Sequence, residues 1–401
     1  MSAAGEPVDL SVLERVDDPY PVLADLRASG PVRRTTDGFW AVTGYAEALD
    51  ALRHPGCATS PIALRFLEGL PDGAARDEMV HRINFLDPPD HPRVRGLLST
   101  AFTPRRTAAI RPWVDSTSAE LAGELAAVGS PFDLLSQFAH QVPSFVISQL
   151  LDVPLSDRDR LTEFSDRTAP LLALRTSSAQ RADAVAAAEE FHAYLGALLD
   201  RRVAEPGDDL LTALAQAEAE GERLSRPELL SLAATLYSAG HRTTRDLFAN
   251  GMSVLLDEPD RWRRVVDGEW SVPDVVGEFL RIETPTLYVV RVPLEPMVLG
   301  GVEVGPWEPL VVLLGAANRD PAVYDGPDEF RPGRDGPPPL SFAFGAHYCL
   351  GASLARSEAE SMLGALVDAF PGLHDVAPPA GRRRWHQRGP FRGLDQLIVA
   401  G

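Results

Sequence analysis

Residues 342–352 read Phe342-Ala-Phe-Gly345-Ala-His347-Tyr-Cys349-Leu-Gly351-Ala, and the helical pattern SLARSEAESMLGALVDAF follows at once. Cys349 therefore lies at the start of a predicted helix. Unpaired backbone amides and the helix dipole favour a thiolate there, the form of cysteine that ligates metals. Gly345 and Gly351 would allow the backbone to turn tightly and to approach a flat cofactor closely. The alternative is a buried structural cysteine, because free cysteines are often core residues.

The middle of the chain has the pattern of a helical protein. Apolar residues recur at helical spacing from about residue 90 to 285. The segment Ser225-Arg-Pro-Glu228 is a capping box, which predicts the start of a helix that ends near Leu256. This helix is apolar nearly all round before Gly240, which indicates burial. A further helix is expected from about residue 273, ending before Pro285 because a proline disfavours helical geometry in the residue before it.

Composition and short apolar runs complete the expected architecture, which is mainly α with small β-sheets. Strands are predicted in the runs LYVVRV, MVLGGVEV and LVVLL and on both sides of the Asp37-Gly38 turn. The chain has 401 residues, of which 45% are hydrophobic and 24% charged, as in ordinary globular proteins. Neither a repeat nor a long linker divides it, so one domain over residues 1–401 is the simplest prediction.

Charge and residue usage exclude several classes of function. The net charge is −19 and no long basic run is present, which argues against nucleic acid as a partner. The chain contains no lysine, which excludes Schiff-base lysines and P-loop lysines. The acidic N-terminal segment is unlike a signal peptide, and no apolar run reaches about 18 residues, so we expect a cytoplasmic protein without a membrane anchor. Cys57 and Cys349 are the two cysteines, and at least one is expected to have a chemical role.

The cysteine segment resembles the cysteine-ligand loop of the cytochrome P-450 family. The family pattern FxxGxxxCxG is met by Phe342, Gly345, Cys349 and Gly351, and further segments match in the same order along nearly the whole chain. The resemblance implies the cytochrome P-450 fold, with haem b (iron protoporphyrin IX) between the long central helix and the cysteine-ligand loop. It also implies that Cys349 is the protein ligand of the iron, whereas Cys57 has no such context.

The segment Glu278-Phe-Leu-Arg281 matches the ExxR helix of the family, with an acid and an arginine one turn apart. Taken alone, such a pair is more often a surface ion pair that contributes little to stability. The resemblance implies instead a buried ion network that supports the cysteine loop. Arg334 is the candidate for the third member of this network, and Glu329 stands where some family members have arginine.

Four basic residues are expected to bind the haem propionates. The segment 87–95, DPPDHPRVR, resembles the family segment DPPxHxxxR, so His91 and Arg95 would bind a propionate from one helix. An imidazole and a guanidinium suit a carboxylate because both form charge-assisted hydrogen bonds with it. The resemblance assigns Arg291 and His347 to the propionates as well. Without the resemblance, all four would be ordinary surface or half-buried polar residues.

The segment 239–244, Ala-Gly-His-Arg-Thr-Thr, matches the AGxxT pattern of the long helix. In the family, small residues such as Ala239 and Gly240 leave room for dioxygen, and the threonine, here Thr243, hydrogen-bonds the bound oxygen. The chain departs from the family at Arg242, where many members carry an acid that passes protons. Two interpretations stay open: Arg242 pairs with Asp246 one turn on, or it faces the pocket and binds a substrate carboxylate.

The resemblance implies a monooxygenase, because a thiolate ligand favours O–O cleavage. The chain has no dinucleotide fingerprint, so electrons are expected from a separate ferredoxin and its ferredoxin reductase. An acidic ferredoxin would need a local basic patch on a chain of this charge, and the candidates are Arg105, Arg106, Arg111 and Arg356. We expect a monomer. The substrate is a small molecule, and hydroxylation of an unactivated C–H bond is the expected outcome.

Substrate selection is expected from the loop between residues 60 and 85, the helices between 155 and 200, and four positions of the pocket wall. These positions are Thr235, Ser238, Leu287 and Val289. They are mostly apolar or small, so a medium-sized, largely apolar molecule, such as an intermediate of secondary metabolism, fits best. The residues name neither the compound, nor whether a carrier holds it, nor the position oxidised.

Three other functions compete with this interpretation. A peroxide-driven or substrate-carboxylate-assisted oxidase on the same scaffold is favoured by Arg242. A non-catalytic binding module is disfavoured, because Cys349 and Thr243 are both present. A serine hydrolase is suggested by Gly351-Ala-Ser353-Leu-Ala355, but the final glycine of the nucleophile elbow is missing.

Overall fold

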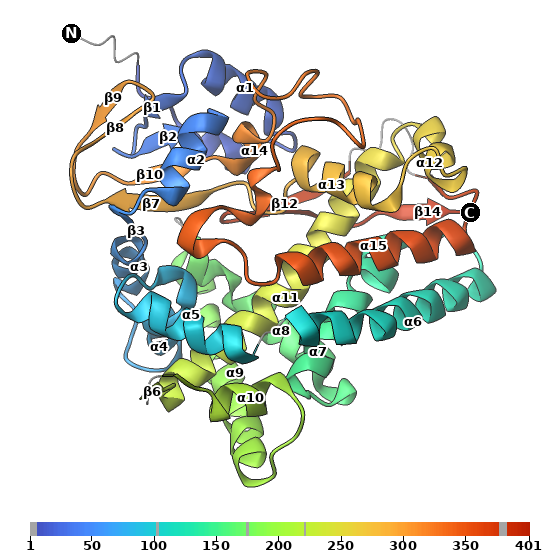
Figure 1. Cartoon of the computed structure of the whole chain (residues 1–401), viewed down its shortest axis with the longest axis horizontal. Coiled ribbons are helices and arrows are strands. Elements are labelled where there is room, and N and C mark those ends of the chain that lie inside the picture. The colour runs from blue at the N-terminus through green and yellow to red at the C-terminus, as the bar shows by residue number, and fades with distance from the viewer. Residues whose placement is uncertain (1–5, 102–103, 174–175, 220–221, 377–382) are drawn as a thin grey trace. The chain divides into compact units, whose positions relative to one another are not determined.

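The computed structural model describes residues 6–101, 104–173, 176–219, 222–376 and 383–401, and it is mainly helical with small β-sheets (Figure 1). The chain separates into two compact units. The first unit consists of residues 1–58, 115–140 and 243–401, and the second of residues 59–114 and 141–242. The chain passes between the units after residue 58, after residue 140, and within the helices α6 (Pro104–Val128) and α11 (Arg226–Leu255). A single domain over residues 1–401 stays a prediction.

The first unit contains the small sheets and the helices around the cysteine segment. Its helices and helical turns are η1 (Leu10–Arg15), α1 (Tyr20–Ala28), α2 (Tyr45–Arg53), η3 (Leu135–Ala139), α12 (Pro259–Val266), α13 (Val272–Ile282), α14 (Leu314–Ala317), η6 (Leu340–Phe342), η7 (Gly345–His347) and α15 (Ala352–Ala369). Its strands are β1 (Val32–Arg34), β2 (Trp40–Val42), β3 (Cys57–Ala58), β4 (Phe132–Asp133), β7 (Val289–Pro293), β8 (Met297–Leu299), β9 (Val302–Val304), β10 (Leu310–Val312), β11 (His374–Asp375), β12 (Trp385–Arg388), β13 (Phe391–Leu394) and β14 (Ile398–Ala400).

The main sheet of the first unit has the strand order β1-β2-β10-β7-β3. Strand β10 runs parallel to β2 and antiparallel to β7, where Leu310 lies opposite Arg291. Helix α2 lies beside this sheet (Figure 1) and buries Ala48 and Leu52 in the same core as Val42 and Leu310. The predicted strands are confirmed as β7, the β8–β9 hairpin and β10. The predicted hairpin is also confirmed, as β1 and β2.

The second unit is built almost entirely from helices. Its helices and helical turns are α3 (Ser60–Leu67), α4 (Ala74–His81), η2 (Ile83–Phe85), α5 (Asp90–Ala101), α7 (Gln141–Leu151), η4 (Leu155–Asp157), α8 (Arg158–Thr168), η5 (Ala169–Leu172), α9 (Ser178–Ala204) and α10 (Leu210–Gln216), followed by the short strands β5 (Glu218–Ala219) and β6 (Glu222–Arg223). The prediction of a loop between residues 60 and 85 is wrong, because α3 and α4 occupy most of that range.

The long predicted helix is confirmed as α11, and its capping box is formed. The Ser225 N–H donates to the Glu228 carboxylate at 2.7 Å, and the Glu228 N–H donates to the Ser225 hydroxyl at 3.5 Å. The same carboxylate pairs with Arg93 of α5, so the cap also holds α5 against the start of α11. The helix predicted from residue 273 is confirmed as α13. Among the described residues, no helix is long and apolar enough to span a membrane.

Candidate functional site

The cysteine loop, residues 342–351, leads from η6 to α15. Cys349 is exposed and lies just before the first turn of α15. The Cys349 N–H donates to the Phe342 carbonyl at 3.0 Å, which closes the loop. Gly345 has a φ of +75°, and a Cβ there would lie 2.8 Å from the Leu52 carbonyl oxygen of α2. Only glycine fits there, so the backbone that carries Cys349 is fixed against α2.

The structure gives Gly351 no special role in the backbone of this loop, whereas Phe342 packs within it. Gly351 has a φ of −86°, and a Cβ there would meet no atom within 4 Å. The structure therefore shows no backbone need for glycine at residue 351, contrary to the expectation of a tight turn. The Phe342 ring lies edge-on to Tyr348, with 6.3 Å between the ring centroids, and the Arg356 guanidinium lies 5.2 Å from the Phe342 centroid.

Glu278, Arg281 and Arg334 form a buried ion network in the first unit. Arg281 Nη2 donates to Glu278 Oε1 at 2.7 Å, and Arg334 Nη2 donates to the same oxygen at 3.1 Å. The exposed fractions of the three side chains are 3%, 2% and 9% in sequence order. Glu329 contributes its backbone carbonyl, which accepts from both arginines, while its side chain pairs with Arg331. The single Glu278 carboxylate is therefore held between two guanidinium groups.

Asn318, which the sequence analysis did not identify, connects this network to the cysteine loop. Arg281 Nη1 donates to the Asn318 carbonyl at 3.0 Å. The Asn318 side chain donates to the Ser341 hydroxyl at 2.8 Å and accepts from the Leu340 N–H at 2.7 Å. Leu340 and Ser341 belong to η6, which runs into the loop. A chain of hydrogen bonds thus links Glu278 to the segment that carries Cys349.

Arg291 and His347 belong to the same unit as Cys349. Arg291 lies in β7, is buried, and donates through Nη1 to the Val290 carbonyl at 2.9 Å. His347 is half-buried in η7, within the cysteine loop. Cys57 lies in β3, where its sulfur is 3.8 Å from that of Met297. Burial raises the pKa of the Cys57 thiol to about 11, although Arg291 acts in the opposite direction.

His91 and Arg95 lie one turn apart on α5, in the second unit. His91 is buried and Arg95 is half-buried. The His91 N–H donates to the Asp87 carbonyl at 3.0 Å, which fixes the start of α5. The Asp87 carboxylate accepts from the Thr59 N–H at 2.9 Å and the Ser60 N–H at 2.7 Å, so this aspartate also caps α3. The two basic side chains thus share one rigid helix.

One face of α11 is accessible in the middle of an otherwise buried helix. Of residues 231–253, all of which the structure describes, every residue is buried except Leu236, Ala239, Gly240 and Thr243. Their helical spacing places these four on one face. Ala239, Gly240 and Thr243 are the positions where the resemblance expects room for dioxygen. A Cβ at Gly240 would lie 3.0 Å from Ile147 of α7, so glycine also permits this close packing, a reason that we did not predict.

Arg242 does not pair with Asp246, as one of the two interpretations expected. Its Nη2 donates to Asp166 of α8 at 3.0 Å and to the Ser165 carbonyl at 2.5 Å. Asp246 accepts instead from Arg245 Nε at 2.8 Å. The pairing was mispredicted because α8 is distant in sequence but packs against α11. A substrate carboxylate would have to compete with Asp166 for the guanidinium, which argues against the second interpretation too.

The four expected pocket-wall residues differ in their surroundings. Thr235 and Ser238 are buried, and their hydroxyl oxygens have no hydrogen-bond partner in the described part of the chain. Val289 is half-buried. Leu287 is fully buried and lies within contact distance of the position that a Cβ at Gly315 would occupy. Leu287 therefore offers no accessible surface to a ligand, whereas the two hydroxyls have free hydrogen-bonding capacity.

Glu358 is a second residue that the sequence analysis missed. It lies in α15, and its side chain is 1% exposed. Burial raises its pKa well above the ordinary range, and a hydrogen bond from the Thr244 side chain only partly offsets this. Burial thus favours the neutral form of this carboxyl group in the helix that follows Cys349. No motif distinguished this glutamate from the other acids of the chain.

The arginines proposed for ferredoxin docking are only partly described. Arg356 is half-buried beside Phe342, and Arg111 is half-buried in α6. The side chains of Arg105 and Arg106 lie outside the described residues. Docking at these arginines stays a prediction.

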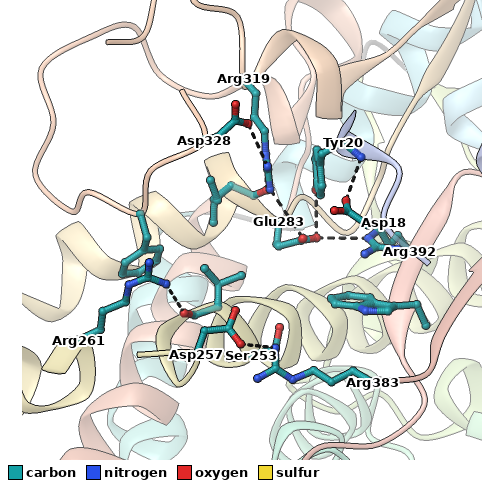
Figure 2. Close-up of a pocket in the computed structure, with 14 residues that line it drawn as sticks. Asp18, Tyr20, Ser253, Asp257, Arg261, Glu283, Arg319, Asp328, Arg383 and Arg392 are labelled. Carbon is teal, nitrogen blue, oxygen red and sulfur yellow. Dashed lines mark hydrogen bonds and ion pairs between the residues drawn. The ribbon is translucent and has the colours of Figure 1, made fainter. Parts of the chain in front are cut away.

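A charged cavity of about 330 Å³ lies in the first unit, and no residue of the cysteine loop lines it (Figure 2). Its arginines are paired with acids: Arg261 with Glu258 at 2.6 Å, Arg319 with Asp328 at 3.2 Å, Arg383 with Asp257 at 2.7 Å and Arg392 with Glu283 at 3.3 Å. Two of them also stack on aromatic rings, Arg319 at 3.3 Å from the Tyr20 centroid and Arg392 at 3.7 Å from that of Trp385. The charged residues that line this cavity form a structural network of ion pairs. None of the predicted site residues is among them.

Comparison with known proteins agrees with this arrangement. The family model "Cytochrome P450" matches residues 272–380, which include the ion network and the cysteine loop. The chain is 35% identical to the mycinamicin IV hydroxylase/epoxidase of Micromonospora griseorubida over 383 residues, which is 94% of each protein. It is also 35% identical to the 6-deoxyerythronolide B hydroxylase of Saccharopolyspora erythraea, over 95% of this chain and 96% of that enzyme. The crystal structure of CalO2 superposes with a TM-score of 0.89 at 30% identity, over 100% of this chain and 99% of the other.

The chain therefore belongs to the cytochrome P450 family, whose members bind a haem through a cysteine thiolate. It is a P450 monooxygenase, an oxidoreductase. The residues present fit such a cofactor. Cys349 is accessible at a helix start, Arg291 supplies a buried cation in the same unit, and α11 has an accessible strip of small residues.

Proposed function

We propose that this protein inserts one atom of dioxygen into a medium-sized, largely apolar substrate of secondary metabolism, with haem b as cofactor and Cys349 as the iron ligand. The observation that carries the proposal is the cysteine loop, in which Cys349 is accessible and the backbone is fixed by Gly345. When bound, the haem supplies oxygen activation, which a thiolate ligand favours.

The chain's own residues hold the cofactor and control access to it. His91, Arg95, Arg291 and His347 would bind the propionates, since guanidinium and imidazole groups form charge-assisted hydrogen bonds with carboxylates. Thr243 would hydrogen-bond on the oxygen side of α11, and Ala239 and Gly240 would leave the space it needs. Phe342, Gly345 and Gly351 would shape the cysteine side.

Two observations support the substrate class. Relatives over most of the chain are a mycinamicin IV hydroxylase/epoxidase and a 6-deoxyerythronolide B hydroxylase. Thr235 and Ser238 have buried hydroxyls without a partner among the described residues, and an unmet buried hydroxyl costs about 1–3 kcal/mol. A substrate that is apolar but carries a hydroxyl or carbonyl group would satisfy them. Val289, which is half-buried in β7, would supply an apolar contact.

The electron source decides between this proposal and its closest competitor. A ferredoxin with its reductase is the proposed donor, whereas Arg242, in place of the usual acid, favours a peroxide-driven enzyme. Purified protein should therefore be tested with ferredoxin, reductase, NAD(P)H and ¹⁸O₂, and separately with hydrogen peroxide, using 6-deoxyerythronolide B and mycinamicin IV as probes. One ¹⁸O atom per product with the ferredoxin system supports the proposal. Product from peroxide alone supports the competitor. Cytoplasmic location and a monomeric state stay predictions.

A further inference from the structure

Arg242, which stands where many relatives have an acid, pairs with a carboxylate of the neighbouring helix α8. Arg242 Nε and Nη2 both donate to Asp166 Oδ1, at 3.2 and 3.0 Å. The same Nη2 donates to the backbone carbonyl of Ser165 at 2.5 Å and lies 3.3 Å from its hydroxyl. Three acceptors on two consecutive residues of α8 therefore fix one buried guanidinium.

The two partners differ in their access to water. The Arg242 side chain is 4% exposed, whereas that of Asp166 is 31% exposed. An arginine is always charged in proteins and cannot release a proton. A carboxylate that meets solvent on one side and a buried cation on the other can take up a proton from water and release it inward. Of this pair, only Asp166 has the chemistry of a relay.

We propose that Asp166 is the proton-relay residue on the oxygen side of this enzyme and that Arg242 is the positioning residue that holds it. The inference rests on the proposed function. In each transfer the Asp166 carboxylate binds one proton from solvent as its contact with Arg242 opens. It then releases that proton toward Thr243, the residue that follows Arg242 in α11, and the carboxylate and its contact with Arg242 are restored. Each oxygen atom inserted requires two such protons, while the electrons come from the proposed ferredoxin.

Two other assignments of these residues are weaker. Arg242 as an anchor for an anionic substrate would require breaking its contacts with Asp166 and Ser165. Glu358 as the relay is disfavoured because its side chain is 1% exposed and has no direct access to water. The relay through Asp166 therefore has the stronger structural support.

The test compares two variants of Asp166 in α8 with one variant of Asp183 in α9, all in the haem-loaded enzyme. Asp166→Asn keeps the size of the side chain and cannot carry a proton, whereas Asp166→Glu can. Asp183→Asn is the matched control, because Asp183 pairs with Arg167 of α8 at 2.7 Å. Measurements are product formed and hydrogen peroxide released per NAD(P)H, the effect of D₂O on the rate, and the melting temperature, with 6-deoxyerythronolide B and mycinamicin IV as probes.

We expect Asp166→Asn to slow product formation about 100-fold or more, because a positioned general acid contributes about 10²–10⁴-fold to the rate. The variant should also release peroxide and change the D₂O effect. Asp166→Glu and Asp183→Asn should behave as the wild type in these measurements. Thr243→Ala is the positive control for uncoupling. If Asp166 had only a structural role, both asparagine variants would have a lower melting temperature, and both would form the same amount of product per NAD(P)H.

A second experiment exchanges the charges of residues 242 and 166. Arg242→Asp combined with Asp166→Arg returns the acid to α11 and should recover coupling, whereas Arg242→Asp alone places two carboxylates together and should not. The inference is overturned if Asp166→Asn couples as well as Asp183→Asn, or if Glu358→Gln uncouples the enzyme while Asp166→Asn does not. Failure of the proposed function is distinguishable, because wild-type protein would then consume no NAD(P)H with ferredoxin, whatever residue occupies position 166.

Discussion

Cys349 and Cys57 belong to the same unit but lie in opposite kinds of environment. Cys349 is exposed, lies before an 18-residue helix and is carried by a loop with its own hydrogen bonds. Cys57 is half-buried in a two-residue strand and contacts the sulfur of Met297. Burial raises the pKa of the Cys57 thiol to about 11, so this cysteine stays protonated under ordinary conditions.

The difference shows that the surrounding backbone, more than the thiol itself, separates the proposed iron ligand Cys349 from the packed residue Cys57. A helix start favours the thiolate, and an apolar strand disfavours it. At Cys349 the backbone is further fixed by Gly345 and by the hydrogen bonds that run from Glu278 through Asn318. Cys57 is held instead by its strand pairing with β7 and by the hydrogen bond from its N–H to the His54 carbonyl.

The largest expected effect comes from exchanging the two cysteines separately for alanine. Cys349→Ala should abolish the red-shifted Soret band that reduced, thiolate-ligated haem gives with carbon monoxide, because the proposed ligand is gone. Cys57→Ala is the control and should retain the band. The comparison fails if Cys349→Ala keeps the band or if Cys57→Ala loses it.

The second effect concerns the support below the cysteine loop. Glu278→Gln leaves Arg281 and Arg334 buried opposite a neutral group, and breaking a buried ion pair in this way costs about 3–5 kcal/mol. Urea denaturation measures the change in the free energy of unfolding. Glu258→Gln removes an exposed partner of Arg261 and should cost no more than about 1 kcal/mol. Equal losses in the two variants would refute the special role of the network.

The third prediction concerns Gly345, where the expected loss of stability is smaller. Gly345→Ala forces a residue with a side chain to a φ of +75°, with its Cβ 2.8 Å from the Leu52 oxygen. Such backbone strain costs about 1–3 kcal/mol, and haem retention should fall with it. Gly364→Ala is the matched control in α15, where a Cβ has open space and alanine stabilises a helix by about 1 kcal/mol. Thermal unfolding with haem absorbance reports both changes. A tolerated Gly345→Ala would contradict the close packing.

The smallest effect is the pH dependence of Cys57. Because the thiolate is the reactive form, alkylation of Cys57 by iodoacetamide should be slow near pH 8 and should accelerate about tenfold per pH unit up to a pH of about 11. Peptide mass spectrometry after short exposure measures modification at this residue alone. Rapid alkylation of Cys57 at pH 8 would show that its thiol is not protected as the structure indicates.

Local sequence predicted the elements whose determinants are local. The capping box of Ser225 and Glu228 located the start of α11, and Pro285 marked the limit of α13, because both depend on the nearest residues. Helices α3 and α4 were missed because prolines and glycines in residues 60–85 suggest a loop. Pro61 lies in the first turn of α3, where a missing N–H costs nothing, and the Ala74 N–H at the start of α4 is capped by Glu189 of α9.

The candidate site also has some residues that local sequence predicts and others that depend on distant contacts. The motif around Cys349 and the pair Glu278 and Arg281 are contiguous in sequence, so their pattern could be read directly. Asn318 and Asp166 could not be found, because each acts through a contact with a residue far along the chain. Arg242 shows the limit most clearly: its position is visible in the sequence, but its partner depends on how α8 packs against α11.

The buried carboxyl of Glu358 links folding of this protein to the acidity of its surroundings. Above the ordinary pKa of a glutamate, the unfolded chain has released this proton and the folded chain still holds it, so folding takes up a proton at this side chain. The stability that Glu358 contributes is full at low pH and declines as the pH rises toward its elevated folded value. The formal net charge of −19 counts Glu358 as ionised, although burial in α15 favours its neutral form.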